Sequence, residues 1–435
     1  MTNNEKEKTS HYRWIVLVLI FAVFTIVYAD RANIGFVLPL IKAEFQLSNF
    51  AAGSLASLFF LGYAITQIPA GFLYSRFGER KILPFFILAT SVFTGLIGTS
   101  SSAFWMQLYR VGLGVSEGPV PIGMGSTINK WFPAKEKGTA TGVYLAATKM
   151  APALVGPICV LILSFGGGWR SVFFWFAVPG SFSAIIWYFL VHNQPSESPY
   201  CSQGEVNYIK NVETTKEVKQ SKKHLSLGWI DRLIRGKKMQ PLDTSKKIFQ
   251  SWNIWGAMFG CFCTLNVVLG LLTWLPTYLL TVKGFSFMKM GFVASAPWIG
   301  AIVGATVGGW ISDNIFNERR KPIMIIGTIL TVGMMLALTN LPNDPMMISI
   351  ILFLTGFCVY LGYSGFITYP MGLTTKEVYP VAYGLVNSGG NLGGFFAPMI
   401  IGLLLDSFNF NTVFIFLAAS SALSLLFVLT LEEPI

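Results

Sequence analysis

The feature that most constrains this chain is a series of apolar runs, each about 20 residues long, which recur along its whole length. A helical run of that length spans the roughly 30 Å hydrocarbon core of a bilayer. Only helices and closed barrels satisfy the hydrogen bonds of their own backbone inside a membrane. Barrel strands alternate apolar and polar residues over about ten positions, and these runs do not. The sequence therefore predicts an all-α polytopic membrane protein.

The composition agrees with a membrane protein. Of the 435 residues, 53% are hydrophobic and only 12% are charged, whereas a soluble domain carries roughly 25% charged residues. This balance excludes a cytosolic enzyme, a disordered protein and a disulfide-rich secreted module. The five cysteines form neither a disulfide framework nor a metal-ligand spacing. No nucleophile–base pair or nucleotide motif stands out, so we expect no enzyme, no metal and no organic cofactor.

The apolar runs predict twelve spans, with one long polar segment between the sixth and the seventh. That segment, 193–252, holds 11 Lys/Arg and 6 Asp/Glu and is interpreted as a cytoplasmic basic linker. It separates an N-terminal six-helix half, 1–192, from a C-terminal six-helix half, 253–435. The spans are expected at 14–38, 49–73, 82–101, 104–127, 139–164, 171–192, 253–280, 289–311, 322–340, 346–370, 380–404 and 409–430.

The net charge of +11 is explained mostly by topology. With the N-terminus inside, 24 of the 31 Lys/Arg fall in cytoplasmic segments, four lie on the other side and three lie within predicted helices. Lys and Arg collect in cytoplasmic loops, so both termini are expected in the cytoplasm, at a bacterial inner membrane. The linker cations are expected near anionic lipid headgroups. We expect contact with the lipid bilayer and no nucleic acid as a partner.

Two similar turns indicate an internal repeat. Gly71–Lys81 follows span two, and Gly308–Asp313 with Arg319–Lys321 follows span eight. Each copy has a glycine-bearing helix end, a tight turn and a basic cluster, at the same place in its half. Such repeats are typical of secondary transporters, although a positive-inside turn alone would also give basic residues here.

The two turns resemble the loop signature of the major facilitator superfamily. The acidic residue of that signature is replaced by Ser75 in the first copy and kept as Asp313 in the second. The resemblance implies a role in gating for Arg76, Gly78, Arg80 and Asp313.

Five charged residues lie deep within the predicted spans, and all of them are in the N-terminal half. A charge at the bilayer centre costs roughly 2.5–3.5 kcal/mol on insertion scales, so each one needs an explanation. One explanation is structural ion pairing, for example between Asp30 and Arg110. However, the five charges sum to +1, and to +3 when both acids are protonated, which favours an anion as ligand. They are Asp30, Arg31, Arg110, Glu117 and Lys149.

Proton coupling follows from the same charges. Burial favours the neutral form of a carboxyl group, so Asp30 and Glu117 are the natural proton carriers. Their protonation would strengthen anion binding, which is the electrostatic basis of proton–anion symport. Arginine binds carboxylates bidentately, and Asn387 and Asn391 lie one turn apart on a helix of the other half. With Tyr63, these groups suit a polar anion that carries hydroxyls.

Five sequence segments resemble the anion:cation symporter branch of the major facilitator superfamily. They are Tyr28–Asn33 in span one, Phe60–Gly71 in span two, Arg110–Pro119 in span four, Trp274–Leu279 in span seven and Asn387–Pro398 in span eleven. The resemblance covers nearly the whole chain. It implies the major facilitator fold, with twelve helices in two pseudo-symmetric halves, and the proton-driven uptake of organic anions such as sugar acids.

The resemblance also assigns roles to individual residues. Asp30 and Glu117 match the protonatable pair of the branch. Lys149 departs from the branch, which more usually has a small or neutral polar residue there. We hypothesise that Lys149 engages a second negative charge and favours a dianion, such as a dicarboxylate, an aldarate or a sulfonated carboxylate. Alternatively, Lys149 balances Glu117. The residues that match substrate contacts are Arg31, Tyr63, Arg110 and Asn391.

The sequence thus predicts a monomeric, proton-coupled symporter that imports a small organic anion by alternating access. Protons are the coupling ion, and the lack of a Walker motif argues against ATP. One alternative is an organic phosphate/phosphate antiporter, which would place a cation in each half. A drug exporter is disfavoured by the three buried cations. A non-transporting anion sensor stays open.

Overall fold

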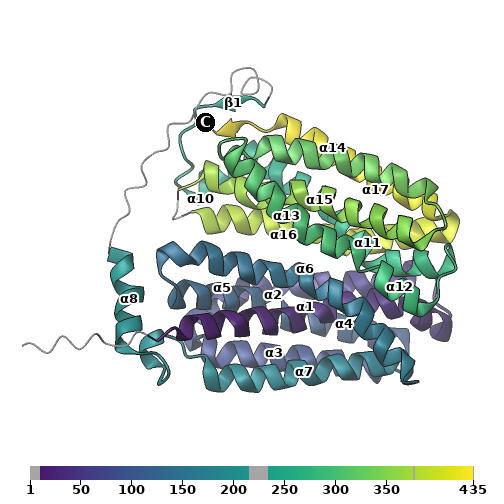
Figure 1. The fold of residues 1–435 in the computed structure, drawn as a ribbon, viewed down its shortest axis with the longest axis horizontal. Helices are drawn as coiled ribbons and strands as arrows, with labels where there is room; N and C mark the ends of the chain where they lie inside the picture. Colours follow the sequence, from purple (N-terminus) through teal and green to yellow (C-terminus); the bar gives the residue numbers. More distant parts are fainter. Residues whose placement is uncertain (1–9, 215–233, 376–377, 435) are drawn as a thin grey trace, which may run out of the picture. The chain divides into compact units, whose positions relative to one another are not determined.

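The computed structural model describes residues 10–214, 234–375 and 378–434, and these residues are almost entirely helical (Figure 1). Eleven helices within these ranges are long and apolar enough to cross a membrane. They confirm every predicted span except the fourth, to within a few residues at most ends. The protein is a multi-pass membrane protein of the expected all-α class.

The N-terminal half contains the first six predicted spans as seven helices. The first helix continues to Phe45, past its predicted end at 38, because Pro39 is accommodated inside it. The helices are α1 (Tyr12–Phe45), α2 (Asn49–Phe77), α3 (Glu79–Gly98), α4 (Ala103–Glu117), α5 (Val120–Trp131), α6 (Ala134–Ser164) and α7 (Gly168–Leu190).

The predicted fourth span is a broken helix. It divides into α4 and α5 at Gly118–Pro119, where the missing N–H groups of Pro119 and Pro121 interrupt the hydrogen-bond ladder. Neither piece is long enough to span a bilayer alone, and together they cover the residues of the predicted fourth span. Glu117 therefore ends a helix instead of lying in the middle of one.

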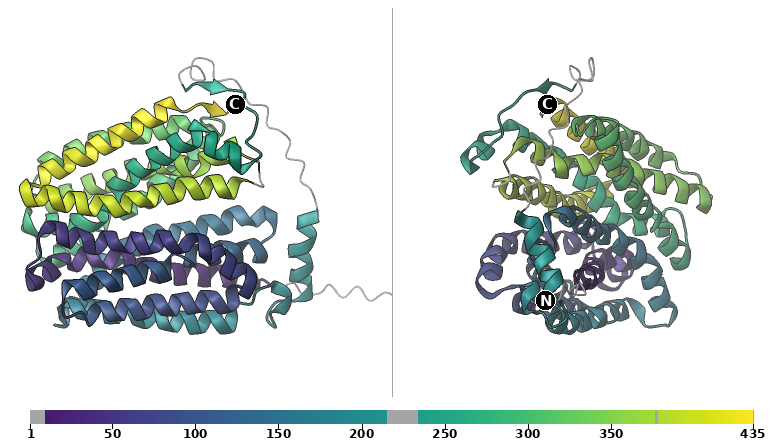
Figure 2. Two further views of the ribbon diagram at one scale, coloured as in Figure 1. Left: turned by 180° about the vertical axis from the view of Figure 1, so that it is seen from behind. Right: turned by 60° about the vertical axis from the view of Figure 1, so that its left-hand side comes forward.

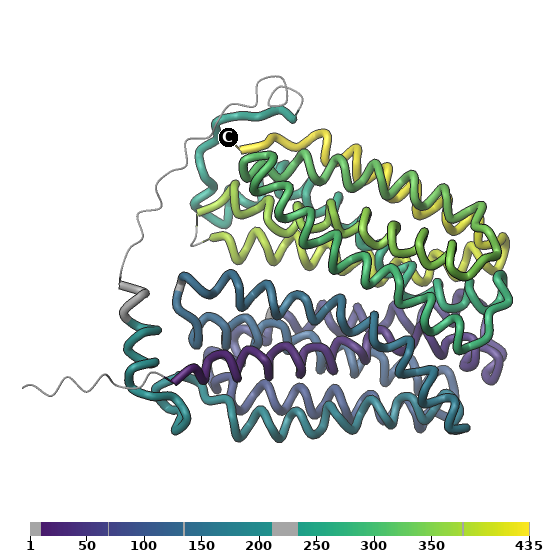
Figure 3. Tube along the Cα trace, viewed as in Figure 1, coloured from purple at the N-terminus to yellow at the C-terminus, as the bar shows by residue number. Residues whose placement is uncertain are grey.

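After α7 the chain passes through a short 3-10 turn, η1 (Pro195–Glu197), into α8 (Gln203–Thr214), a path that Figure 3 traces. The described elements that follow include β1 (Gly236–Lys237) and α10 (Ser245–Gln250). The remaining spans are α11 (Trp252–Thr281), α12 (Phe287–Val293) with α13 (Ala296–Asn314), α14 (Lys321–Ala337) extended by η2 (Leu338–Asn340), α15 (Pro345–Leu373), α16 (Tyr379–Ser407) and α17 (Phe410–Thr430). The last described element is β2 (Glu433–Pro434).

The contacts between residues group the chain into two units. The first contains Met1–Arg31, Leu61–Ala151 and Ile162–Gln220, and the second contains Ala32–Phe60 and Pro152–Leu161 with Ser221–Ile435. Helices α1, α2 and α6 therefore each contribute to both units. The predicted boundaries at 192 and 253 follow the sequence repeat and stay a prediction.

Equivalent helices pack together inside the two units. In the first unit α3 lies beside α7, as Figures 1 and 2 show, and in the second unit α14 lies beside α17. These pairs are the third and sixth spans of each half. The predicted repeat of the sequence thus has a counterpart in helix packing.

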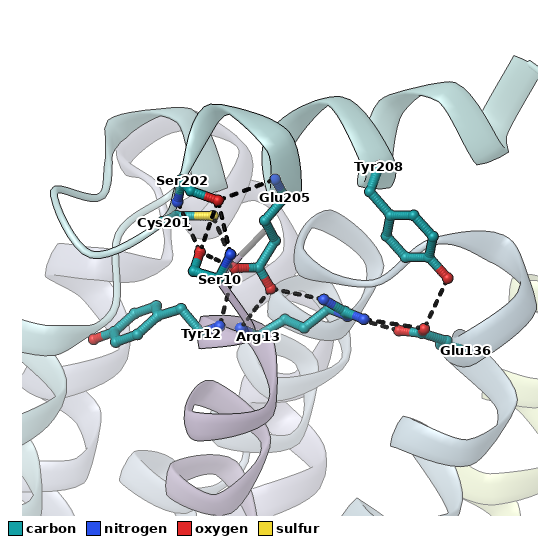
Figure 4. A network of polar contacts seen from close by, with 8 residues as sticks. All are labelled: Ser10, Tyr12, Arg13, Glu136, Cys201, Ser202, Glu205 and Tyr208. Carbon is teal, nitrogen blue, oxygen red and sulfur yellow. Dashed lines mark hydrogen bonds and ion pairs between the residues drawn. The ribbon is translucent and has the colours of Figure 1, made fainter. Parts of the chain in front are cut away.

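The first part of the linker is docked onto the first unit through α8 (Figure 4). The buried Glu205 carboxylate accepts hydrogen bonds from the backbone N–H groups of Tyr12 and Arg13 and from the Ser10 hydroxyl. Arg13 also forms ion pairs with Glu205 and with Glu136 of α6, both at 2.8 Å. Burial alone would raise the pKa of Glu205, but hydrogen bonds from Ser10 and Arg13 hold it below its ordinary value. The N-termini of α1 and α6 are thereby joined to α8.

Candidate functional site

The centre of the candidate site is a buried ion pair between α1 and α4. Arg31 Nη2 lies 2.6 Å from Glu117 Oε1, and Glu117 is completely buried while Arg31 is 6% exposed. The two residues are 86 positions apart in the sequence. The structure therefore pairs one predicted substrate contact with one predicted proton carrier.

Two aromatic rings hold the guanidinium of Arg31. Its Cζ atom lies 4.4 Å from the centroid of the Tyr28 ring and 4.7 Å from that of the Tyr63 ring. Such stacking is favourable for a cation and also fixes its plane. Tyr63 lies beside the cation, and its predicted role in substrate binding stays a prediction. Tyr28 was not among the predicted site residues, although its position one helical turn before Arg31 could have indicated it.

A close approach of α2 to α4 creates this arrangement. A Cβ atom on Gly62 would lie 2.2 Å from the carbonyl oxygen of Val111, and one on Gly118 would lie 2.6 Å from the carbonyl oxygen of Tyr63. Only glycine lets two backbones approach this closely. The contact brings Tyr63 of α2 to the end of α4, where Glu117 lies.

The two carboxylate oxygens of Glu117 differ in their contacts. Its Oε1 atom accepts the bond from Arg31, whereas Oε2 is buried without a hydrogen-bond partner among the described residues. A half-satisfied buried carboxylate is costly as an anion. A proton on Oε2 would turn that oxygen into a donor and weaken the attraction to Arg31.

Asp30 and Arg110 lie beside this pair. Both side chains are almost fully buried, each at 1% exposure. Arg110 Nη1 donates a hydrogen bond to the backbone carbonyl of Asp30 at 3.3 Å. Arg110 thus ties α4 to α1, as the sequence suggested, and the bond described here goes to the backbone of Asp30.

Lys149 lies on α6, which runs alongside α1 in the first unit. Helices α1 and α6 run parallel, because Arg13 contacts Glu136 at their starts and Phe24 contacts Tyr144 further along, with ring centroids 4.6 Å apart. Five residues beyond that second contact, a rise of about 7.5 Å, α6 has reached Lys149 and α1 is one residue short of Asp30. The ammonium of Lys149 donates to the Leu145 carbonyl at 3.2 Å.

The predicted asparagines belong to the second unit and are described there. Asn387 and Asn391 are partly buried on α16, and Asn391 Nδ2 donates to the Asn387 carbonyl at 2.9 Å. They share a helix face, as their spacing predicted. Their place relative to the charged cluster of the first unit stays a prediction.

The four predicted gating residues lie at helix ends. Gly78, with φ of +77°, precedes α3, and a Cβ atom there would lie 2.5 Å from the Asn193 side chain. Arg80 donates to the Tyr188 carbonyl at 3.2 Å, and Arg76 stacks on Phe77. Asp313, at the end of α13, pairs with the guanidinium of Arg320. Their role in gating stays a prediction.

Comparison with known families agrees with this architecture. The model of the Major Facilitator Superfamily matches residues 20–398, with a second match over 317–435. A solved bacterial homologue of the human lysosomal transporter Spinster, in an inward-facing and unoccupied conformation, superposes with a TM-score of 0.75 at 17% identity. That match covers 97% of this chain and 98% of the other, and it supports the fold.

Three relatives are named as transporters of sugar acids. The probable galactarate/D-glucarate transporter GarP of Escherichia coli is 29% identical over 98% of this chain and 95% of its own. A D-galactonate transporter of Escherichia coli is 28% identical over 95% and 94% of the two chains. The probable galactarate/D-glucarate transporter GudP of Bacillus subtilis is 27% identical over 98% and 93%. These relatives agree with the resemblance to the anion:cation symporter branch, and the family match spans most of the chain. The chain belongs to the Major Facilitator Superfamily, and it is a transporter, not an enzyme.

Proposed function

We propose that this protein is a proton-coupled symporter that imports a small organic anion across a bacterial inner membrane, with both termini in the cytoplasm. The observation that carries the proposal is the buried Arg31–Glu117 ion pair. A guanidinium that is already desolvated, and held by two aromatic rings, is prepared to receive a carboxylate. The names of the relatives, which transport sugar acids, support the same class of substrate.

The ion pair supplies a coupling step. A proton on Glu117 removes the charge that holds Arg31, so the guanidinium is released to bind the substrate carboxylate. Asp30 takes the second proton, and Arg110 beside it completes a cationic wall. Loss of the substrate returns Arg31 to Glu117 and expels the proton. The two halves then alternate access around the loaded site.

We further propose that the substrate is a sugar acid with two negative charges. Lys149, on the helix that runs alongside α1, would supply a cation beyond the two arginines. A monoanion would engage the arginines alone, whereas a dianion would also engage Lys149. Asn387 and Asn391 would bind hydroxyl groups of the sugar acid. The alternative, in which Lys149 balances Glu117, leaves the choice of charge to other residues.

The direct test is uptake by proteoliposomes containing the purified protein. We expect an inward proton gradient to drive accumulation of galactarate or glucarate, and Glu117→Gln and Asp30→Asn each to reduce it at least tenfold. Full proton-driven accumulation in both variants would overturn the coupling mechanism. Binding of these anions in a thermal-shift assay without any uptake would favour a sensor instead.

The charge preference has a separate test. Wild-type protein and Lys149→Gln are compared for galactarate, a dianion, and galactonate, a monoanion. We expect Lys149→Gln to lower the ratio of galactarate to galactonate uptake by about tenfold, equivalent to one lost ionic hydrogen bond. An unchanged ratio would sink the dianion hypothesis while leaving symport intact.

A further inference from the structure

The residue three positions beyond α7 caps another helix of the first unit. Asn193 Oδ1 accepts a hydrogen bond of 2.9 Å from the backbone N–H of Arg80, in the first turn of α3. In return, the Arg80 side chain donates to the Tyr188 carbonyl in the last turn of α7. Trp131, at the end of α5, donates to the His192 carbonyl at 3.0 Å. The segment after α7 therefore ties α3, α5 and α7 together.

The residue three positions beyond α17 does the same in the second unit. The Glu433 carboxylate accepts hydrogen bonds of 2.7 and 2.8 Å from the backbone N–H groups of Arg320 and Lys321, at the start of α14. The Lys321 ammonium donates to the Leu429 and Leu431 carbonyls. Tyr369, near the end of α15, donates to the Glu432 carbonyl.

These two sets of contacts are equivalent by position. In each half, the residue three past the sixth span accepts from the start of the third span. A cation at that start donates to carbonyls at the end of the sixth span, which suits the dipole of the helix C-terminus. An aromatic side chain from the end of the fourth span donates to the carbonyl two past the sixth. The residue types differ between the copies, so the sequence alone does not indicate the equivalence.

Each cap lies against a predicted gating loop. In the first unit, the Asn193 side chain occupies the space that a side chain on Gly78 would need. In the second unit, the backbone of Arg320 is held by Glu433 while its guanidinium contacts Asp313 and Ser312. Glu433 therefore fixes the position of Arg320, the residue that forms the ion pair with Asp313.

We propose that Asn193 and Glu433 are positioning residues for the two gating loops, and that they act by anchoring the first turn of the helix after each loop. The residues after α17 thus help to hold the second gating loop in place. The copies differ in strength, because Glu433 offers two carboxylate oxygens to two N–H groups and Asn193 offers one amide oxygen to one. The link to transport rests on the proposed function, but the anchoring does not.

Hydrogen–deuterium exchange on the purified full-length protein tests the anchoring directly. We expect Glu433→Ala to speed amide exchange at the start of α14 about tenfold, and Asn193→Ala to speed it at the start of α3 about threefold, as for the loss of a helix cap. The matched controls are the neighbouring Glu432→Ala and Gln194→Ala, whose side chains are not caps. Equal exchange in a variant and its control would overturn the proposal for that loop.

Uptake then tests positioning against a merely structural role. We expect Glu433→Ala to lower the maximal uptake rate about fivefold with KM unchanged, since loop steps limit turnover and not binding. Glu433→Gln and Asn193→Asp retain an acceptor oxygen and should recover most of the rate. A raised KM at an unchanged maximal rate would contradict the proposal. If Glu433→Ala does not fold, the exchange and uptake of Asn193→Ala and Glu433→Gln decide the question. If wild-type protein transports nothing, the proposed function fails, while the exchange result still decides the anchoring.

Discussion

The interiors of the two halves differ in the kind of polar group that they bury. In the first unit, charged side chains of α1 and α4 lie within a few ångströms of each other, with Arg31 and Glu117 paired at 2.6 Å. In the second unit, the polar contacts between α11 and α17 involve hydroxyl and amide groups. The hydroxyl oxygens of Thr264 and Ser424 are 3.1 Å apart, and the Asn266 amide donates to the Ser420 hydroxyl at 3.3 Å.

This difference separates coupling from packing. A buried ion pair is costly to form and changes its partner when one member is protonated, so it is a two-state element. Interhelical hydrogen bonds between hydroxyls are weak, and they join helices without changing state. Under the proposed function, the charged groups that couple transport therefore belong to the first unit, and the α11–α17 contacts of the second unit serve packing.

The largest expected effect comes from removing one member of the charged pair. Arg31→Ala leaves Glu117 buried as an unpaired anion, which costs about 3–5 kcal/mol. We expect loss of uptake and a large fall in the melting temperature in detergent, measured by intrinsic fluorescence. Arg31→Lys is the control, because it keeps the charge and loses the fork. A melting temperature of Arg31→Ala equal to that of wild type would show that the pair is not a structural ion pair.

A smaller effect is the pH dependence of stability at the start of α14. Here the ionisable group belongs to the second unit and the neutral one to the first. There the cap of the second unit is the ionisable Glu433, and that of the first unit is the neutral Asn193. Burial raises the pKa of Glu433 from its ordinary value near 4.5 to about 7, against the hydrogen bonds from Arg320 and Lys321. Arg235, Asp313 and Glu432 also lie near this end.

The sign of the pH effect follows from linkage. Between pH 4.5 and 7 the folded state holds the proton of Glu433 more tightly than the unfolded state does, so stability falls as pH rises. The loss is on the order of 3 kcal/mol, complete above pH 7. Glu433→Gln carries no proton to lose, so its melting temperature should fall less than that of wild type over this range. Parallel melting curves for both proteins would contradict the prediction.

A still smaller effect is expected in the neutral interior. Ser424 is buried, and its hydroxyl donates to the Gly260 carbonyl at 2.8 Å. Ser424→Ala should cost about 1 kcal/mol or less and leave proton-driven uptake unchanged. Thr355→Ala removes a hydroxyl that bonds to the Ile351 carbonyl of its own helix, and it serves as the matched comparison. A selective loss of coupling in Ser424→Ala would break the separation between the halves.

The smallest effect on stability comes from replacing both members of the ion pair. Well-packed apolar residues often replace a buried pair at little cost, so Arg31→Met combined with Glu117→Leu should melt within a few degrees of wild type. Uptake should nevertheless be abolished. Thermal melting and proteoliposome uptake on the same preparation measure both. A double variant as unstable as Arg31→Ala would show that the pair is needed for folding itself.

Much of the fold could be predicted from the apolar runs. A helix that crosses a bilayer must satisfy its backbone hydrogen bonds within itself and expose apolar side chains to lipid, so its length and hydropathy identify it in the sequence. The sequence does not predict the break at Gly118–Pro119, because membrane helices tolerate proline where neighbouring groups satisfy the freed backbone. The predicted first span ends too early for the same reason, since α1 continues through Pro39.

The buried charges of the candidate site could also be predicted, but not all of their partners could. A charge inside a span is rare enough to be noticed on its own. Which charge it meets depends on how α2 and α4 approach each other, and that approach is set by Gly62 and Gly118. The sequence suggested a contact between Asp30 and Arg110, and Arg110 does bond to the backbone of Asp30. It did not suggest that Arg31 would meet Glu117.

By itself, the sequence determined the membrane class, eleven of the twelve predicted spans and the identity of the buried charges, because bilayer insertion depends on each segment separately. Only the tertiary structure decided that Arg31 faces Glu117, that Tyr28 and Tyr63 enclose it, and that Asn193 and Glu433 occupy equivalent places. Contacts between distant segments depend on the close packing of several helices at once, and no single segment carries that information.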